Sequence, residues 1–320
     1  MLENNIPWIE KYRPNKLENI KSQDFVKQSL QKLVETNTIP HLLFFGSPGT
    51  GKTSTIIACT KELERNGYIV SKLELNTSDQ RGINTVRKKI KEFASTRSFF
   101  ENGLKIIILD EADSMTNIAQ CALRRIIEKY SKNVRFCIIC NYINKIIPAI
   151  QSRCMKFRFS LLADNEIKEK IKRIAVKENL EIPENGIQTI VELSSGDMRK
   201  AINILQSIPM FCKGMIINDE NIRSCLGFPT KEMIDSIFDI LISKKNLCEK
   251  YTIINETIKQ NGILLRDLLK CLHKKVLLNK SMFNKKQLIE IFKIFSLIEY
   301  YLTLNINENI QLGVLISSFI

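Results

Sequence analysis

The stretch Gly46-Ser47-Pro48-Gly49-Thr50-Gly51-Lys52-Thr53 matches the pattern G-x-x-x-x-G-K-[ST] at every defined position. The apolar run Leu42–Phe45 precedes it and predicts a buried strand, and the residues from Ser54 to Glu64 predict a helix. In this order, a strand, a glycine-rich loop and a helix N-terminus let backbone N–H groups converge on phosphate oxygens. A chance glycine-rich turn would need neither the Lys-Thr pair nor the flanking strand and helix. The sequence therefore predicts a site for a nucleoside triphosphate.

The side chains of this loop have separate expected roles. Glycines at 46, 49 and 51 let the chain wrap closely around phosphates. Lys52 can reach the β- and γ-phosphates, and the Thr53 hydroxyl can hold Mg²⁺. We expect the residues from Gly46 to Ser54 to contact this nucleotide.

An acidic pattern, Lys105 to Asp113, reads K-I-I-I-L-D-E-A-D. Four apolar residues followed by two carboxylates place Asp110 and Glu111 at the end of a strand, on the edge of the sheet that carries the phosphate loop. Asp110 suits the Mg²⁺ shell, and Glu111 can polarise the attacking water. An acidic turn after a buried strand is common by itself. Together with the phosphate loop it indicates nucleotide hydrolysis.

Short apolar runs alternate with helical patterns up to about residue 157: Leu42–Phe45, Lys72–Leu75, Lys105–Leu109, Arg135–Cys140 and Met155–Phe159. This alternation predicts an α/β fold, a parallel sheet with helices on both faces. From about Leu161 the strand signals vanish and helical periodicity takes over. We expect a nucleotide-binding domain at 1–160, a helical domain at 161–227 and an all-helical domain at 228–320.

Composition limits the class of protein. The chain has 320 residues, of which 44% are hydrophobic and 26% charged, as in ordinary globular proteins. The sequence has no run of about 18 apolar residues, and Glu3, Pro7 and Glu10 interrupt any apolar core of a secretory signal. We therefore expect an intracellular protein without a membrane partner. The net charge of +14 reflects either solvated lysines or a polyanionic partner such as DNA or RNA.

The nine cysteines do not predict a metal site. The close pair Cys137-x-x-Cys140 lies in an apolar run that predicts a core strand, and no second pair or histidine cluster accompanies it in the sequence. His41 and His273 each stand alone. Reduced thiols are expected.

Three polar residues fit around the acidic pair. Asn141 follows an apolar run and could orient the attacking water from a neighbouring strand tip. Arg153, in the turn Ser152-Arg153-Cys154, either solvates a surface or reaches a phosphate. Arg199 lies in the first turn of a helix that begins near Asp197. Taken singly, such residues more often serve structure than function.

Together these motifs resemble the small subunits of replication factor C, the eukaryotic and archaeal AAA+ sliding-clamp loader. The match runs through about residues 6–227, whereas the last third is similar only in length and helical character. Phe93–Arg97 and Ala119–Arg125 resemble one particular small subunit. Gln80 departs from the pattern N-A-S-D-D-R-G that is usual in the family, and Thr77 in place of Ala is a minor departure. The main resemblance is carried by Pro7–Pro14, Gly46–Thr53, Leu75–Gly82, Asp110–Asp113, Ser152–Cys154 and Gly196–Lys200.

The resemblance implies an AAA+ domain, a helical lid and a helical collar, and it assigns roles to individual residues. Tyr12 and Arg13 would pack near the adenine. Asn141 would be sensor 1 and Arg199 sensor 2. Arg153 would be an arginine finger that serves the ATP of the neighbouring subunit.

The resemblance also implies partners. The chain would be one subunit of a heteropentamer that binds and hydrolyses ATP with Mg²⁺, opens the sliding clamp and loads it on primer–template DNA. This would occur in the nucleus during replication and repair. Arg81, Arg87 and Lys145 would contact DNA phosphates without reading sequence. From the residues alone, the basic face at 87–91 is more often merely solvated.

Two alternatives stay open. One is a catalytically idle scaffold that binds ATP only to assemble, and the intact Lys52 and Glu111 argue against it. The other is a different AAA+ DNA motor, such as a helicase loader or a branch-migration ATPase. The Ser-Arg-Cys turn and the Lys-Tyr-Arg-Pro segment favour the clamp loader over such a motor.

Overall fold

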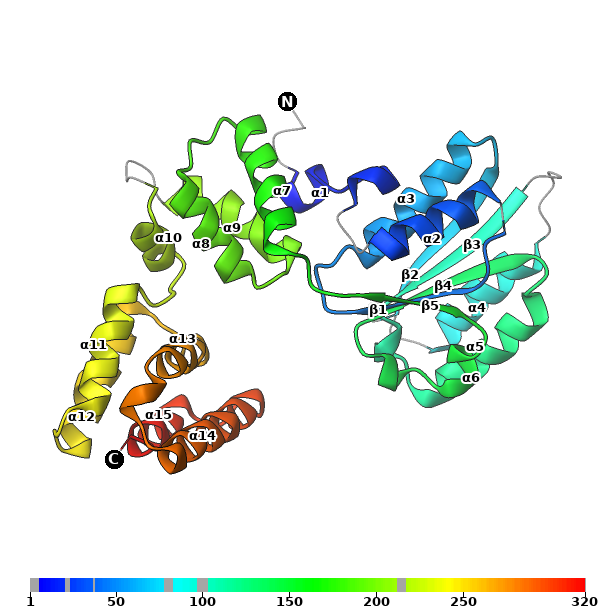
Figure 1. Cartoon of the computed structure of the whole chain (residues 1–320). Helices are drawn as coiled ribbons and strands as arrows, with labels where there is room; N and C mark the ends of the chain where they lie inside the picture. The colour runs from blue at the N-terminus through cyan, green and yellow to red at the C-terminus, as the bar shows by residue number, and fades with distance from the viewer. Residues whose placement is uncertain are drawn as a thin grey trace. The chain divides into compact units, whose positions relative to one another are not determined.

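The chain folds into two compact units, each with its own apolar core (Figure 1). The structure, a computed structural model, describes residues 6–20, 24–36, 38–77, 83–96, 103–211 and 217–319, with the backbone alone at 83–87 and 211. The first unit comprises the residues up to 179 together with 190–206, and the second comprises 180–189 together with 207–320.

The first unit is built on a five-stranded parallel sheet with the strand order β2-β3-β4-β1-β5. Every apolar run that predicted a strand is one, so the predicted α/β class is confirmed. The second strand begins at Ile69, before the predicted Lys72, and the residues of its first half are exposed or partly exposed. The strands are β1 (Leu42–Gly46), β2 (Ile69–Asn76), β3 (Gly103–Asp110), β4 (Val134–Cys140) and β5 (Met155–Phe159).

The register of the sheet brings several strand ends to one edge. Phe45 of β1 pairs with Cys140 of β4, and Leu109 of β3 pairs with Ile138 of β4. Asn76, the last residue of β2, pairs with Asp110. The polar residues that follow these strands therefore meet at the carboxyl edge, where α/β sheets bind ligands.

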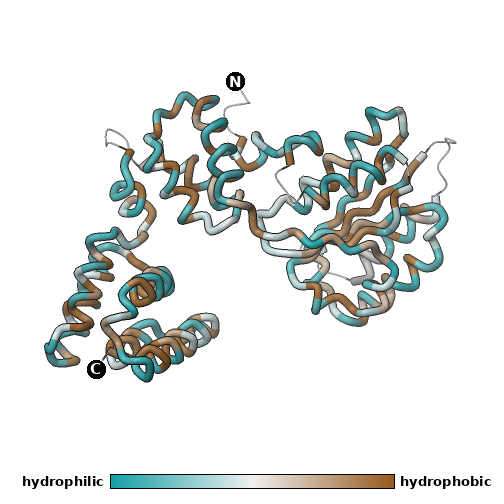
Figure 2. The backbone as a smooth tube through the Cα atoms, viewed as in Figure 1, coloured by the Kyte–Doolittle hydropathy of each residue, from teal (hydrophilic) through white to brown (hydrophobic). Residues whose placement is uncertain are grey.

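Helices cover both faces of the sheet (Figure 1). Successive strand residues point to opposite faces, so Phe44 packs in the core on one face and Leu43 in the core on the other. Figure 2 shows the apolar residues gathered along the strands between these helical layers. One layer is α2 (Asp24–Glu35) and α3 (Lys52–Arg65), and the other is α4 (Ile83–Ser95), α5 (Asn117–Tyr130) and α6 (Pro148–Gln151).

Short helices connect these elements, and longer helices follow the sheet. The periodicity after Leu161 predicts helices, and the described residues beyond it contain helices and connections alone. The short elements are α1 (Trp8–Lys11), η2 (Leu17–Asn19), η3 (Ala112–Ser114) and η4 (Ile143–Lys145). The helices that follow β5 are α7 (Asp164–Lys177), α8 (Glu184–Ser194), α9 (Met198–Phe211) and α10 (Asp219–Cys225).

The second unit has a helical core of its own, with buried residues such as Leu268, Leu272 and Ile298. The buried ammonium of Lys250 donates a 2.8 Å hydrogen bond to the carbonyl of Leu241 and so satisfies a carbonyl in the last turn of α11 (Lys231–Ile242). Among the described residues, no helix is both long enough and apolar enough to cross a membrane. The elements are α11 (Lys231–Ile242), α12 (Leu247–Asn261), α13 (Leu265–Leu278), η5 (Lys280–Met282), α14 (Lys285–Thr303) and α15 (Glu308–Ser317).

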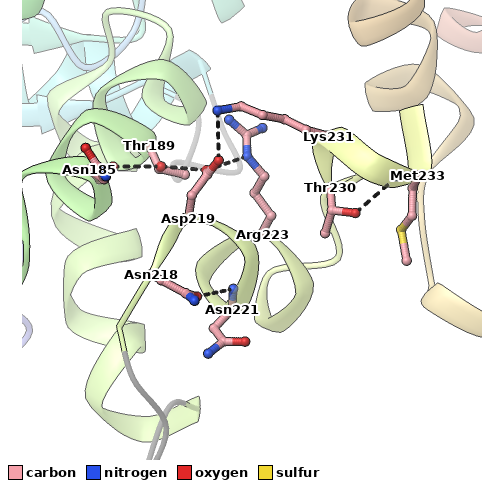
Figure 3. Close-up of polar contacts among 9 residues, drawn as sticks. All are labelled: Asn185, Thr189, Asn218, Asp219, Asn221, Arg223, Thr230, Lys231 and Met233. Atoms are coloured by element: carbon pink, nitrogen blue, oxygen red, sulfur yellow. Dashed lines mark hydrogen bonds and ion pairs between the residues drawn. The ribbon is translucent and has the colours of Figure 1, made fainter. Parts of the chain in front are cut away.

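One carboxylate joins three helices inside the second unit (Figure 3). Asp219, in the first turn of α10, accepts hydrogen bonds from the Thr189 hydroxyl of α8 and from Nε of Arg223, both at 2.7 Å. The ammonium of Lys231 at the start of α11 lies 3.1 Å from its other oxygen. Burial raises the pKa of the Asp219 carboxyl, but the three donors outweigh burial and bring that pKa to about 2. The carboxylate therefore stays charged at physiological pH and ties α8, α10 and α11 together.

Candidate nucleotide site

The phosphate loop connects β1 to α3, as the motif predicts. Gly46 has φ 138°, and a Cβ there would lie 1.9 Å from the carbonyl oxygen of Phe159. A glycine is therefore required for the loop to leave the sheet between β4 and β5. Helix α3 begins at Lys52, so its unpaired N–H groups and positive end face the loop. This is the geometry that binds phosphate.

Lys52 lies at the centre of the site and is only 8% exposed. Its ammonium donates 2.8 Å hydrogen bonds to the carbonyls of Gly46 and Ser47, and a 3.0 Å bond to Oδ1 of Asn141. Burial, and then the positive charge of Arg199, lower the pKa of this ammonium. The structure thus brings together three residues that the sequence suggests separately: Lys52, Asn141 and Arg199.

Thr53 and Asp110 also meet. The Thr53 hydroxyl donates a 2.7 Å hydrogen bond to Oδ2 of Asp110, and Oδ1 of Asp110 accepts from the backbone N–H of Glu111. Mg²⁺ prefers hard oxygen ligands and takes one or two from protein beside nucleotide phosphates. A hydroxyl and a carboxylate oxygen in contact at the phosphate loop fit that requirement. The described residues contain no larger group of His, Cys, Asp and Glu side chains that could hold a metal.

Glu111 begins the turn after β3 with a left-handed backbone, φ 54°. This conformation costs a non-glycine residue about 1–3 kcal/mol. The Thr77 hydroxyl donates a 2.7 Å hydrogen bond to the Glu111 carbonyl, and the backbone N–H of Ser114 donates to the same oxygen at 2.9 Å. The Glu111 side chain is exposed, as a residue that meets water must be. Thr77 replaces an Ala of the family pattern, a departure that looks minor in the sequence, yet its hydroxyl stabilises this turn.

The N-terminal segment and the helices after the sheet line a cavity of about 360 Å³ beside the loop. Such a volume lies within the range of ligand pockets. Tyr12 and Arg13 line this cavity, as does Arg199. The other lining residues are Ile9, Glu10, Pro14, Asn19, Ile20, Gly49, Thr50, Gly51, Ser54, Leu162, Lys170, Met198 and Ile202.

The carboxylate of Glu178, the C-cap residue of α7, holds the N-terminal segment in place. Glu178 accepts a short hydrogen bond from the Tyr12 hydroxyl, and its Oε1 lies 2.6 Å from the Lys11 ammonium. On the other side, Arg13 Nε lies 3.4 Å from the Ser54 hydroxyl. No sequence signal marks Glu178, because its partners precede it by more than 160 residues.

Helix α9 begins against the phosphate loop. Asp197 caps this helix as its position predicts, since Oδ1 accepts from the backbone N–H groups of Arg199 and Lys200 at 2.8 and 3.2 Å. The backbone N–H of Met198 donates to the carbonyl of Gly49 at 3.2 Å. The contact between Gly49 and this helix start has no signal in the sequence.

Arg153 lies at the opposite edge of the sheet from the phosphate loop. It precedes Met155, which pairs with Leu42 at the start of β1. One guanidinium nitrogen lies 2.6 Å from a carboxylate oxygen of Glu128, and another donates to the Ala149 carbonyl at 2.6 Å. Its side chain is 39% exposed. Arg153 therefore does not join the site formed by Lys52 and its neighbours.

The candidate DNA contacts are only partly described. Lys145 lies in η4 with an exposed side chain, and its ammonium is 5.3 Å from the centre of the Tyr142 ring. Arg87 lies on α4, but its side chain is outside the described residues. Arg81 and Gln80 also lie outside them. The role of these residues stays a prediction.

Curated relatives match this chain over nearly its whole length. Replication factor C subunit 5 of Homo sapiens is 44% identical over 317 residues, which cover 98% of this chain and 92% of that protein. The chain belongs to the replication factor C family. Probable replication factor C subunit 5 of Dictyostelium discoideum is 45% identical, covering 98% and 90%, and replication factor C subunit 3 of Saccharomyces cerevisiae is 41% identical, covering 96% and 91%. These subunit numbers, 3 in yeast and 5 in human, are those of the small subunit to which Phe93–Arg97 and Ala119–Arg125 point.

Family models agree with this membership. Residues 42–161 match "ATPase family associated with various cellular activities (AAA)", residues 164–219 match "RFC1-like, AAA+ ATPase lid domain", and residues 229–318 match "Replication factor C C-terminal domain". The expected AAA+ ATPase fold and the family resemblance are therefore confirmed.

A solved structure shares the fold at low sequence identity. The RuvB Holliday junction branch migration motor of Thermotoga maritima superposes with a TM-score of 0.55 at 18% identity, covering 80% of this chain and 88% of that one. At this identity the likeness concerns the fold alone.

Proposed function

We propose that this chain is an ATP-hydrolysing subunit of a sliding-clamp loader that acts on primer–template DNA. The observation that carries the proposal is the convergence of Lys52, Asn141, Thr53 and Asp110 at the carboxyl edge of the sheet. The full-length similarity to replication factor C subunits supports the assembly in which such a site would work.

ATP binding follows from the loop geometry. Backbone N–H groups from Gly46 to Ser54 would surround the phosphates, and the Lys52 ammonium would exchange its carbonyl acceptors for β- and γ-phosphate oxygens. Tyr12 and Arg13 would lie beside the adenine in the cavity. The Thr53 hydroxyl and the Asp110 carboxylate would hold Mg²⁺, which would neutralise negative charge on the phosphates.

Hydrolysis requires a base and a means of orienting water. Glu111 presents an exposed carboxylate next to Asp110 and would accept a proton from the attacking water. Asn141, held beside Lys52, would orient that water or the γ-phosphate as sensor 1. Arg199, on the first turn of α9, would report the γ-phosphate to the lid as sensor 2.

The remaining catalytic group would be an arginine, which adjacent subunits of the ring would supply to one another. Arg153 lies on the other edge of the sheet, so it cannot complete the chain's own site and would reach the ATP of an adjacent subunit. An arginine of the other neighbour would complete this chain's site. We propose that ATP binding orders the ring, which opens the clamp and grips DNA phosphates, and that hydrolysis releases both.

The assembly proposed is a heteropentamer in the nucleus, used in replication and repair. Its collar would be the helices from 228 to 320, its lid the residues 161–227 and its nucleotide-binding domain the residues 1–160. Arg81, Arg87 and Lys145 would contact the DNA backbone.

The test is clamp loading by the reconstituted complex. We expect the complex to place the clamp on primed DNA in an ATP-dependent reaction, and Lys52→Ala in this subunit to remove ATP binding at its site. Labelled-ATP binding and clamp-loading assays measure the two steps separately. Unchanged ATP affinity in a folded Lys52→Ala variant would contradict the site. ATP binding without turnover at this site would instead support an idle scaffold.

A further inference from the structure

The last carboxylate of the D-E-A-D stretch holds the tip of the neighbouring strand. Oδ2 of Asp113 accepts a hydrogen bond from the backbone N–H of Asn141 at 3.2 Å and another from the N–H of Tyr142 at 3.3 Å. Asp113 lies in η3, 28 and 29 residues before these partners. One carboxylate oxygen therefore receives two consecutive N–H groups.

These two N–H groups lie where the strand ladder stops. The last pairing of β4 with β1 joins Cys140 to Phe45, and the last pairing with β3 joins Ile138 to Leu109. Beyond Cys140 the neighbouring strands supply no further register partner. A backbone N–H without an acceptor is costly, and a charged acceptor makes a stronger bond than a neutral one. Asp113 thus supplies the acceptor for the two N–H groups that follow the last strand pairing.

The side chain of Asn141 depends on that backbone. Its Oδ1 accepts the 3.0 Å hydrogen bond from Lys52, whose ammonium also contacts the carbonyls of the phosphate loop. A rotation of the Asn141 backbone would move this amide relative to Lys52 and to the γ-phosphate position. Asp113 also raises the pKa of Lys52 through its charge, a smaller effect than those of burial and Arg199, which lower it. Asp113 is therefore linked to the site both by contact and by charge.

We propose that Asp113 is a positioning residue for hydrolysis, which acts through the backbone of Asn141 and Tyr142 to fix the Asn141 amide beside the γ-phosphate. This inference rests on the proposed role of Asn141. In this role Asp113 would act only through its bonds to these two N–H groups, and not by contact with the nucleotide or the water. Misplacement of a catalytic group by about 1 Å costs about 10²-fold in rate, so removing Asp113 is expected to slow turnover by about 10- to 100-fold.

The experiment uses the reconstituted complex in which the other ATP sites are disabled, so that turnover reports this site. Asp113→Ala, Asp113→Asn, Asn141→Ala and the double variant Asp113→Ala/Asn141→Ala are compared. Asp113→Ala should lower kcat while the affinity for labelled ATP changes less than about threefold. Asp113→Asn keeps an acceptor oxygen and should recover most of the loss. Asp164→Ala, which removes an exposed carboxylate from the first turn of α7, is the matched control and should leave kcat unchanged.

The double variant distinguishes positioning from a general structural role. If Asp113 acts through Asn141, Asp113→Ala should cost little further turnover in the Asn141→Ala background. Equal losses in both backgrounds, or a parallel loss of ATP affinity, would overturn the proposal. If Asn141→Ala slows turnover and Asp113→Ala does not, the positioning role fails and the proposed function stands. If Asn141→Ala itself has no effect on turnover, the proposed role of Asn141 fails, and the positioning role of Asp113, which rests on it, fails as well.

Discussion

The carboxylate of Asp197 occupies the space beside Gly49 that any larger residue would need. A Cβ built on Gly49 would lie 1.6 Å from Oδ1 of Asp197. That oxygen caps α9 through the N–H groups of Arg199 and Lys200, so it cannot move aside without uncapping the helix. The phosphate loop and the first turn that carries Arg199 are therefore in direct contact, and the shape of one constrains the other.

Gly49→Ala should weaken ATP binding by at least about tenfold. Its φ of +70° disfavours any Cβ, and the clash displaces either the loop or the start of α9. Gly67→Ala is the matched control, because Gly67 has φ +88° but no atom within 4 Å of a Cβ. Labelled-ATP titration of both variants measures the difference. Equal affinities for the two would show that the Asp197 contact has no influence on the nucleotide.

Glu111→Gln should leave ATP binding largely intact and slow hydrolysis by about 10²–10⁴-fold. The amide cannot accept the proton of the attacking water, whereas the turn and the Thr53–Asp110 bond remain. Single-site turnover in a complex whose other sites are disabled measures the effect. Wild-type turnover would remove Glu111 from the role of base.

Arg153→Ala should lower hydrolysis at the neighbouring subunit's site by about 10³-fold or more, with normal ATP binding at this subunit. The reason is its position on the sheet edge away from Lys52. Arg173→Ala is the control, since Arg173 is 68% exposed and its ion pair with Glu169, at 3.8 Å, lies on the surface. Complexes in which a single ATP site is competent show at which subunit the hydrolysis rate falls. A loss confined to this subunit's own site would mean that the arginine acts in cis.

Charge reversal at Lys145 or Arg87 should weaken DNA binding by the complex and reduce its salt dependence. Each phosphate contact contributes about 0.9 to the slope of log affinity against log salt concentration. Preference among DNA sequences should stay the same, because such contacts do not read bases. Lys285→Glu, at an exposed lysine of α14, should leave the slope unchanged. Wild-type slopes for both test variants would assign these residues to a solvated surface.

Asp219→Asn should lower the free energy of unfolding of the second unit by about 2 kcal/mol at pH 7. The pKa of Asp219 is about 2 in the folded chain against an ordinary value of 3.8. A pKa shift of one unit corresponds to about 1.4 kcal/mol of stability. Because the folded pKa is depressed, the stabilisation is complete above about pH 4 and is lost as the pH falls through about 2. The difference between variant and wild type should therefore shrink below pH 3.

Urea unfolding at several pH values, monitored through hydrogen exchange of the backbone amides of α10 and α11, measures this effect. Asp235→Asn is the control, because Asp235 is 57% exposed and its pair with Lys275 is a surface ion pair. That variant should lose less than about 0.5 kcal/mol. A difference for Asp219→Asn that does not vary with pH would show that its charge is not the cause.

Much of the site could be predicted from local patterns. The phosphate loop is recognisable because strand, glycines, Lys52 and helix adjoin in sequence, and Asp110 because it ends an apolar strand. The closeness of Asn141 to Lys52 follows from the parallel topology, since strand tips share one edge. The roles of Arg81 and Arg87 stay predictions, as do the domain boundaries at 160 and 227.

The sequence by itself determined which segments form strands and helices, because their apolar spacing needs only neighbours a few residues away. It also determined the nucleotide class, since the loop carries its own chemistry. Only the tertiary structure decided which polar partners meet: Asp113 with Asn141, Glu178 with Tyr12, and Asp197 with Gly49. Those contacts depend on strand register and helix placement, which bring together residues that are 28 to 166 positions apart. Chain-local spacing carries no signal for such pairs.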